Sequence, residues 1–274
     1  MRLQFTKMHG LGNDFMVFDA INQSVQLSPA QLQQLGDRNR GVGFDQLLLV
    51  EAGEGDFDFR YRIFNADGSE VENCGNGARC FARFVNEHAL SNKKELRVIT
   101  AGGPILLQQQ GELISVNMGQ PNFDPASLPF TTDHQADRYS VADDHGNIEF
   151  GAVSMGNPHI VLPTEDVDNA PVERLGPLLE HHPAFPNRVN VGFAQVIDSH
   201  TARLRVFERG AGETQACGTG ACAAMAVNHQ WGKLANEAQI QLPGGNLEIR
   251  WQPGQDLWMT GPAETVYHGE IELD

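Results

Sequence analysis

The stretch from Phe64 to Val85 reads FNADGSEVENCGNGARCFARFV, and in it Cys74 is followed by glycines and a run of small and apolar residues. The pattern returns from Phe207 to Val227, FERGAGETQACGTGACAAMAV, with Cys217 at the position of Cys74. The offset is 217 − 74 = 143 residues. The chain therefore carries two copies of a cysteine placed at the start of a glycine-opened apolar helix.

Further landmarks repeat in the same order. Asn13 and Asn157, each preceded by glycine, are separated by 157 − 13 = 144 residues, and Met118 and Met259 by 259 − 118 = 141 residues. Such order predicts two similarly folded halves. We expect an α/β (α+β) protein with two pseudo-symmetric domains, each a mixed, mostly antiparallel sheet wrapped around a central apolar helix.

Composition limits the classes of function. The chain has 274 residues, of which 41% are hydrophobic, and 19 basic against 35 acidic residues give a formal charge of −16. That charge argues against a nucleic-acid or anionic-membrane surface as the working face. The N-terminal stretch has no apolar signal-peptide core, and no apolar run approaches about 18 residues. We expect a cytoplasmic protein whose four cysteines are thiols.

Periodicity and turn residues predict the elements of the first half. A glycine-rich loop is expected over 9–14, and the helix over 78–89 has no polar face in its first turns, so it should be buried on most sides. The polar segment 122–147 is interpreted as the crossing into the second half. A helix is expected over 29–37, and strands over 2–8, 15–19, 47–50, 57–64, 95–100, 103–109 and 113–118.

The paired cysteines suggest acid/base chemistry. Unpaired N–H groups and the positive end of a helix dipole stabilise a thiolate at a helix start, and the same N–H groups hold a carboxylate. Two such sites facing one ligand across an interdomain cleft would supply a base on one face of a carbon and an acid on the other. The alternative is that Cys74 and Cys217 are buried structural residues, but their matched glycine-flanked settings favour the functional interpretation.

Other cofactor-based interpretations are weaker. Cys80 and Cys222 lie inside the apolar helices and are interpreted as core residues, and the spacing of the four cysteines is not that of a zinc knuckle. Gly10 and Gly12 lack the third glycine and the following helix of a dinucleotide site. No lysine lies in the repeated glycine motifs, which weakens a pyridoxal phosphate enzyme. We therefore expect no cofactor and no metal.

Polar side chains near the glycine loops are candidate ligands for an amino acid. Amides can bind both ends of an amino acid without changing its charge, although each is equally interpretable as a turn former. His159 and Glu208 are candidates to tune a thiol or relay its proton, and Arg209 is a candidate partner for a carboxylate, while a purely structural role is equally open for each. The amides are Asn13, Gln46, Asn65, Asn76, Asn157 and Asn190.

With these motifs in place, the whole chain resembles the diaminopimelate epimerase family. The most specific segments are MHGLGNDF from Met8, GFDQ from Gly43, FNADGSE from Phe64, NCGNGAR from Asn73, SMGNPH from Ser154 and ERGAGETQACG from Glu208. The resemblance implies cofactor-independent epimerisation of LL-diaminopimelate to meso-diaminopimelate, a step in lysine and peptidoglycan precursor biosynthesis. It also implies that Cys74 and Cys217 are the acid/base pair.

The resemblance also implies roles for the polar residues. The distal, non-reacting end of the substrate would be bound by Asn13, Gln46, Asn65, Asn157, Asn190, Glu208 and Arg209. The reacting carboxylate would be bound by Gly75, Asn76, Gly218 and Thr219. Thr219 stands at a position where many members of the family look to have serine. Either hydroxyl can form a hydrogen bond with a carboxylate.

The family pattern implies a domain organisation as well. The first domain would comprise residues 1–117 plus 264–274 and the second residues 118–263, in a homodimer with its active site in the interdomain cleft. Two rivals stay open: a cofactor-free proline or hydroxyproline racemase, and a thiol redox or metal-binding protein that uses Cys74 and Cys217 as a reversible pair.

Overall fold

The computed structural model describes residues 2–71, 74–132, 134–143 and 146–273. The chain forms two compact units, one of Met1–Asn117 with Thr260–Asp274 and one of Met118–Met259. Asn73, which belongs to one of the quoted motifs, lies outside the described residues. The strand β17 (Trp258–Gly261) contains the boundary at which the chain returns to the first unit.

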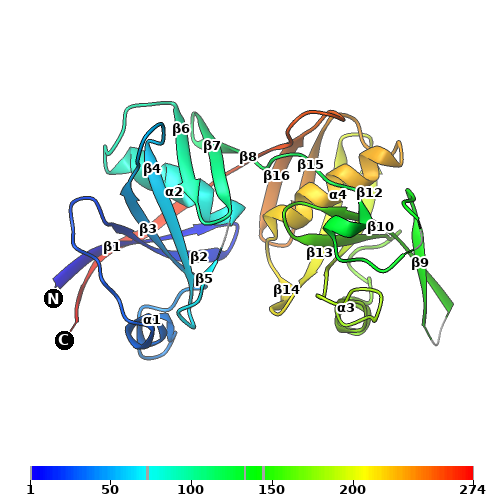
Figure 1. Cartoon of the computed structure of the whole chain (residues 1–274), viewed down its shortest axis with the longest axis horizontal. Coiled ribbons are helices and arrows are strands. Elements are labelled where there is room, and N and C mark those ends of the chain that lie inside the picture. Colours follow the sequence, from blue (N-terminus) through cyan, green and yellow to red (C-terminus); the bar gives the residue numbers. More distant parts are fainter. Residues whose placement is uncertain (1, 72–73, 133, 144–145, 274) are drawn as a thin grey trace. The chain divides into compact units, whose positions relative to one another are not determined.

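The first unit is a mixed sheet with two helices (Figure 1). Its strands pair in the order β18-β1-β2-β3-β4-β6-β7-β8, with β2–β3 and β4–β6 parallel and the other pairs antiparallel. The elements are β1 (Arg2–Gly10), β2 (Asn13–Asp19), α1 (Pro29–Gly36), β3 (Gln46–Ala52), β4 (Phe59–Asn65), β5 (Glu70–Val71), α2 (Gly75–Glu87), β6 (Glu95–Thr100), β7 (Gly103–Gln110), β8 (Leu113–Asn117) and β18 (Glu264–Glu272).

The second unit repeats this topology. Its strands pair in the order β9-β10-β11-β12-β13-β15-β16, and again two of the pairs, β11–β12 and β13–β15, are parallel. The elements are η1 (Pro125–Ser127), β9 (Tyr139–Asp143), β10 (Gly146–Ser154), β11 (Pro158–Pro163), α3 (Val172–Glu180), β12 (Asn190–Asp198), β13 (Thr201–Glu208), β14 (Gly212–Thr214), α4 (Gly218–Gln230), β15 (Glu237–Leu242) and β16 (Gly245–Arg250).

The central helices α2 and α4 are the parts that the sequence pattern predicted most directly. Each has 13 residues, of which 10 are buried, including the glycines and alanines of the first two turns. A helix that is buried all round needs a sheet that wraps it, because an apolar surface without a polar face cannot be left in water. The predicted fold class is therefore confirmed for each unit.

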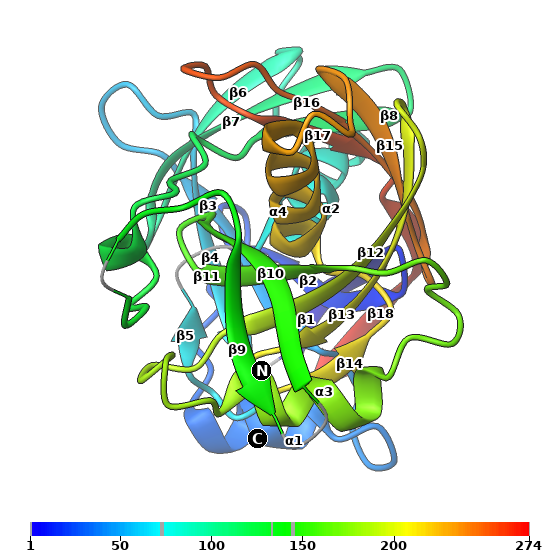
Figure 2. The same cartoon turned by 90° about the vertical axis from the view of Figure 1, so that its right-hand side faces the viewer.

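Two expectations for the connecting segments were wrong. The segment 9–14 is mostly strand, because β1 and β2 form a hairpin whose turn is only Leu11 and Gly12, with φ values of 58° and 88°. A two-residue turn with positive φ values matches the twist of the flanking strands. Leu11 and Gly12 alone are therefore enough to connect β1 to β2. The segment 122–147 is also not merely a crossing, since it contains β9, which Figure 2 shows beside β10 and which pairs with it.

Smaller helices cover other faces of the sheets. In the first unit α1 begins with a capping box between Ser28 and Gln31 and buries Leu32 and Leu35 against the strands. In the second unit α3 buries Leu175 and Leu179 in a cluster with residues of β10, β11 and β12. Among the described residues, no helix is long and apolar enough to cross a lipid bilayer.

Candidate active site

Cys74 is the residue that precedes α2, and its backbone is extended, with φ −148° and ψ 109°. Its sulfur accepts a hydrogen bond from the backbone N–H of Gly77 at 3.4 Å, which is the geometry of an N-cap. Gly77 has no room for a side chain, because a Cβ there would lie 2.1 Å from Tyr61 Oη. The cysteine sulfur is thus held at the N-terminus of a helix, where an anion is stabilised.

Asn13 lies next to this sulfur because the tight β1–β2 turn ends there. Cys74 Sγ donates to Asn13 Oδ1 at 3.8 Å, and Asn76 Nδ2 donates to the same oxygen at 3.3 Å. Arg79, which is completely buried, donates to Asn76 Oδ1 at 3.0 Å. Three of the predicted site residues are therefore in one hydrogen-bonded group, and Arg79 orients one of them.

Sequence reasoning missed the charged network that supports Asn13. Asp14 accepts from Lys7 at 2.6 Å and from Arg38 at 2.7 Å, and Asp45 accepts from Arg38 at 2.7 Å and from Asn13 Nδ2 at 2.8 Å. Burial alone would raise the pKa of Asp14, but its hydrogen bonds with Arg38 and Lys7 lower that pKa to about 2. The sequence contained an indication of this network, because Asp14 directly follows Asn13 and Asp45 directly precedes Gln46.

Gln46 and Asn65 are directly opposite each other in the β3–β4 register. Gln46 Nε2 donates to Asn65 Oδ1 at 3.1 Å, and Asn65 Nδ2 donates to Ser69 Oγ at 3.1 Å. Gln46 Oε1 is buried and has no hydrogen-bond partner among the described residues. A buried carbonyl oxygen without a donor is an available acceptor for a ligand ammonium group.

Cys217 occupies the equivalent position before α4, with φ −114° and ψ 106°, but its surroundings differ. Its thiol donates to Glu208 Oε2 at 3.0 Å, and the other carboxylate oxygen accepts from Thr214 Oγ1 at 2.5 Å. Burial, the negative charge of Glu208 and the hydrogen bond to it all raise the pKa of Cys217 well above its ordinary value. Cys217 is therefore held as a thiol, and Thr219 Oγ1 lies 3.7 Å from its sulfur.

Asn157 and His159 approach the first turn of α4 from β11 and the turn before it. Asn157 Nδ2 donates to Thr219 Oγ1 at 3.3 Å, and His159 Nε2 lies 2.9 Å from Asn157 Oδ1. Burial and the positive charge of Arg209 lower the pKa of His159 to about 3. His159 is consequently neutral near pH 7, and its Nε2–H group donates to Asn157, so the imidazole orients an amide of the site.

Asn190 and Arg209 are joined mainly through the backbone. Asn190 Nδ2 donates to Pro158 O at 2.8 Å, and Asn190 Oδ1 accepts from the backbone N–H of Arg209 at 2.9 Å. The Arg209 guanidinium donates to Asn187 O at 3.3 Å. Asn190 thus fastens the start of β11 to the loop after β13, and the second N–H of its amide has no partner among the described residues.

The two cysteine environments are related residue by residue and differ in charge. Asn65 aligns with Glu208, since 208 − 65 = 143, and Arg79 aligns with Cys222, since 222 − 79 = 143. The first helix start therefore has an amide and a buried guanidinium where the second has a carboxylate and a thiol. Only the second helix start thus places a carboxylate against its cysteine, and this carboxylate favours a proton on Cys217.

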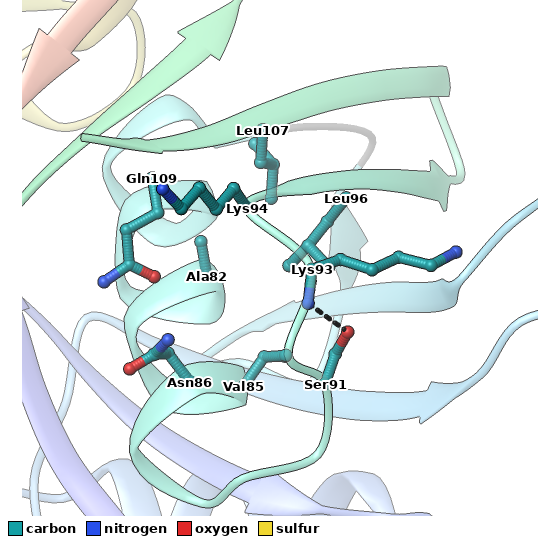
Figure 3. A pocket seen from close by; sticks show the side chains of 9 residues that line it. All are labelled: Ala82, Val85, Asn86, Ser91, Lys93, Lys94, Leu96, Leu107 and Gln109. Carbon is teal, nitrogen blue, oxygen red and sulfur yellow. Dashed lines mark hydrogen bonds between the residues drawn. The ribbon is translucent and has the colours of Figure 1, made fainter. Parts of the chain in front are cut away.

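A separate small hollow lies along the C-terminal half of α2, beside β6 and β7 (Figure 3). Its volume is about 10 Å³, which is enough for about one water molecule. All predicted site residues lie in the described part of the chain, and none of them lines this hollow. It is not a candidate for the substrate site.

The chain is similar in sequence to diaminopimelate epimerases along its whole length. The family model described as diaminopimelate epimerase matches residues 5–123 and 151–266. Curated proteins named diaminopimelate epimerase from Nitrosospira multiformis and Pseudomonas savastanoi pv. phaseolicola are 55% and 58% identical to the chain over 276 residues. These alignments cover 100% of the chain and 99% and 100% of those relatives.

Solved structures share the fold at low sequence identity. A hydroxyproline epimerase from Agrobacterium vitis has a TM-score of 0.70 at 18% identity, covering 100% of this chain and 93% of that one. A probable proline racemase from Agrobacterium radiobacter K84 has a TM-score of 0.69 at 18% identity, covering 99% and 93%. The chain therefore shares its two-unit fold with these two proteins.

The sequence comparisons identify the family of the chain, which the shared fold alone does not. The chain belongs to the diaminopimelate epimerase family. The resemblance predicted from its motifs is confirmed, and the protein is an isomerase of the amino-acid epimerase type.

Proposed function

We propose that this protein interconverts LL-diaminopimelate and meso-diaminopimelate without a cofactor, with Cys74 and Cys217 as the two acid/base groups. The observation that carries the proposal is that each unit places a cysteine immediately before a buried, glycine-opened helix, in chemically opposite surroundings. Cys74 accepts a hydrogen bond from a backbone N–H group, whereas Cys217 donates one to a carboxylate. A stereoinversion by two groups needs this difference, because one starts as a base and the other as an acid.

In the forward direction the Cys74 thiolate removes the α-proton from LL-diaminopimelate. The Cys217 thiol then gives its proton to the opposite face of the same carbon, which leaves Cys74 as a thiol and Cys217 as a thiolate. The reverse reaction begins from those exchanged states. This proposal requires both sulfurs to reach one carbon of the bound substrate, and it assigns the compact units as the two epimerase domains.

The carboxylate next to the reacting carbon would gain negative charge as the proton leaves. Backbone N–H groups at the two helix starts, at Gly75, Asn76, Gly218 and Thr219, would stabilise that charge. The side chains predicted to bind the distal amino-acid end include that of Gln46, whose buried Oε1 is an available acceptor for an ammonium group. Glu208 would have two functions, because the carboxylate that holds the Cys217 proton also belongs to the proposed binding set. The predicted cytoplasmic location and homodimer belong to the same proposal.

The test is solvent-deuterium incorporation with the purified protein, LL-diaminopimelate and no added cofactor. The wild-type protein should form the meso isomer with deuterium at the α-carbon. Cys74→Ala and Cys217→Ala should each lower interconversion by about 10³-fold, the scale of a lost general acid or base. Cys222→Ala is the matched control, because this cysteine is buried in the same helix as Gly218 and should leave turnover within about twofold.

Two outcomes would contradict the proposal. Near wild-type interconversion in either active-cysteine variant would remove the two-base assignment. Turnover of proline in preference to diaminopimelate would favour the racemase alternative, which has no need for a polar site at a second amino-acid terminus. A thiol redox or metal-binding function predicts no α-deuterium in either substrate.

A further inference from the structure

Tyr61 presents a buried hydroxyl group that the proposed mechanism has not used. The residue lies in β4 and has no exposed surface, and its ring packs against Phe81 of α2 with a centroid separation of 4.8 Å. The hydroxyl has no hydrogen-bond partner among the described residues. Buried hydroxyl groups are nearly always paired, so an exception of this kind calls for a physical reason.

The hydroxyl lies at the first turn of α2, beside the backbone that holds Cys74. A Cβ on Gly77 would come within 2.1 Å of Tyr61 Oη, so the oxygen is in contact with this glycine. The N–H of the same glycine donates to Cys74 Sγ at 3.4 Å. The unpartnered donor and the sulfur of Cys74 therefore flank one residue of the helix start.

The repeat shows that this phenol is not a general requirement of the fold. The equivalent position in the second unit is Leu204, since 204 − 61 = 143, and this leucine is buried with 1% of its surface exposed. An apolar side chain therefore suffices for packing under α4. The polar atom occurs only in the unit whose cysteine is proposed to start as a thiolate.

We propose that Tyr61 is a positioning residue that donates a hydrogen bond to the Cys74 thiolate during the reaction. The hydroxyl lacks an acceptor while Cys74 donates its own proton to Asn13, and it gains one when the sulfur is charged. The change of partner requires the sulfur to turn from Asn13 toward the hydroxyl. This inference rests on the proposed role of Cys74 as the base.

The electrostatics of the site agree with a protonated donor. Burial first, and then the charge of Cys74 and Cys80, raise the pKa of Tyr61 well above its ordinary value. Among the described residues, charged side chains near this helix start include Arg79, hydrogen-bonded to Asn76, and Asp45, hydrogen-bonded to Asn13. Burial raises the pKa of Cys80 strongly, so this thiol does not supply a competing thiolate in the ordinary pH range.

The test is Tyr61→Phe, which keeps the ring and removes only the donor. The measurement is the pH dependence of iodoacetamide alkylation at Cys74, read from the mass of the peptide that contains it. Loss of a hydrogen bond to the charged form should raise the midpoint of this curve by about one pH unit. In the same variant kcat for epimerisation should fall about tenfold with KM within about twofold.

Tyr139→Phe is the matched control. It also removes a buried phenol oxygen, one that accepts from the backbone N–H of Ala136 at 2.9 Å in the other unit, and it should leave the Cys74 midpoint unchanged. A midpoint shift below about half a unit in Tyr61→Phe would overturn the inference, whereas a larger upward shift supports it. The alkylation curve needs no substrate, so it decides the role of Tyr61 even if the protein fails to turn over diaminopimelate.

Discussion

One substitution between the repeats contributes to the difference between the two cysteines. Glu208 stands at the position equivalent to Asn65. Its Oε2 accepts a hydrogen bond from Cys217 Sγ at 3.0 Å. Both cysteines precede a helix, where the dipole alone would lower their pKa values. In the second unit burial and the nearby carboxylate outweigh the dipole, so the pKa of Cys217 rises. The charge state at a helix start therefore depends on burial and on the neighbouring side chain as well as on the dipole.

His159 should make the protein sensitive to acid. Burial lowers its pKa to about 3 in the folded protein, against about 6.5 in the unfolded chain, so between these values the unfolded chain binds the extra proton. The stability is present above pH 6.5 and is lost as the pH falls toward 3. His159→Gln should therefore reduce the loss of unfolding free energy between pH 7.5 and pH 5 by about 2 kcal/mol.

Urea unfolding at the two pH values measures this difference. Glutamine can still donate to Asn157, so the comparison isolates the titration from the hydrogen bond. His134→Gln is a control on an exposed histidine. Equal pH dependence in the wild type and in His159→Gln would show that the imidazole is not held neutral by the fold.

At the scale of the element, the glycines at each helix start allow close packing that a side chain would prevent. Gly77 admits the phenol oxygen of Tyr61, whereas a Cβ on Gly220 would lie 3.0 Å from Val206 Cγ2 and 3.2 Å from Cys217 Sγ. One glycine therefore makes room under the helix and the other makes room for the reactive sulfur. This is why the motif is glycine-opened in both copies although the surrounding side chains differ.

Gly77→Ala should destabilise the fold, and Tyr61→Phe should partly restore it. The added Cβ would overlap Tyr61 Oη at 2.1 Å, whereas the next contact, with Phe15 Cε1, is 3.3 Å. Overpacking of this kind costs about 2 kcal/mol, and removal of the oxygen should recover about half of that. Urea unfolding of the two single variants and the double variant gives the coupling. Strict additivity would show that the oxygen does not contact the helix start.

At the scale of the whole chain, its two ends belong to one sheet. β18 pairs antiparallel with β1 from Arg2↔Glu272 to His9↔Glu264, with a register shift at Lys7/Met8. Gly269 packs directly against the ring of Phe5, since a Cβ on this glycine would lie 2.5 Å from Phe5 Cζ. The last strand therefore completes the first unit, to which the chain returns at Thr260.

Gly269→Ala should lower the thermal unfolding midpoint by several degrees. The added methyl group would displace the Phe5 ring, at a cost of about 1–3 kcal/mol, which is about 2–5 °C for a chain of this size. The measurement is near-ultraviolet circular dichroism during heating. Glu270→Ala is the control on the same strand, because its 3.2 Å ion pair with Arg2 is exposed and contributes little. Equal midpoints for the two variants would contradict the close Phe5–Gly269 contact.

Local patterns were sufficient to predict most of the elements and the central feature of the site. The buried helices, the position of both cysteines and the similarity of the two halves were readable, because helix starts and apolar runs are properties of neighbouring residues. The same reasoning failed at residues 9–14, where a turn with φ 58° at Leu11 replaces the expected loop. Composition alone does not distinguish a long glycine-rich loop from a tight hairpin turn.

Partnerships between distant residues needed the tertiary structure. The sequence by itself determined the family, the paired motifs and the two thiols as candidate acid and base. The fold decided that Glu208 holds the Cys217 proton, that His159 is neutral and that the Tyr61 hydroxyl lies unpaired beside Gly77. These properties depend on burial and on distances across strands, and both arise only when residues far apart in the chain are packed together.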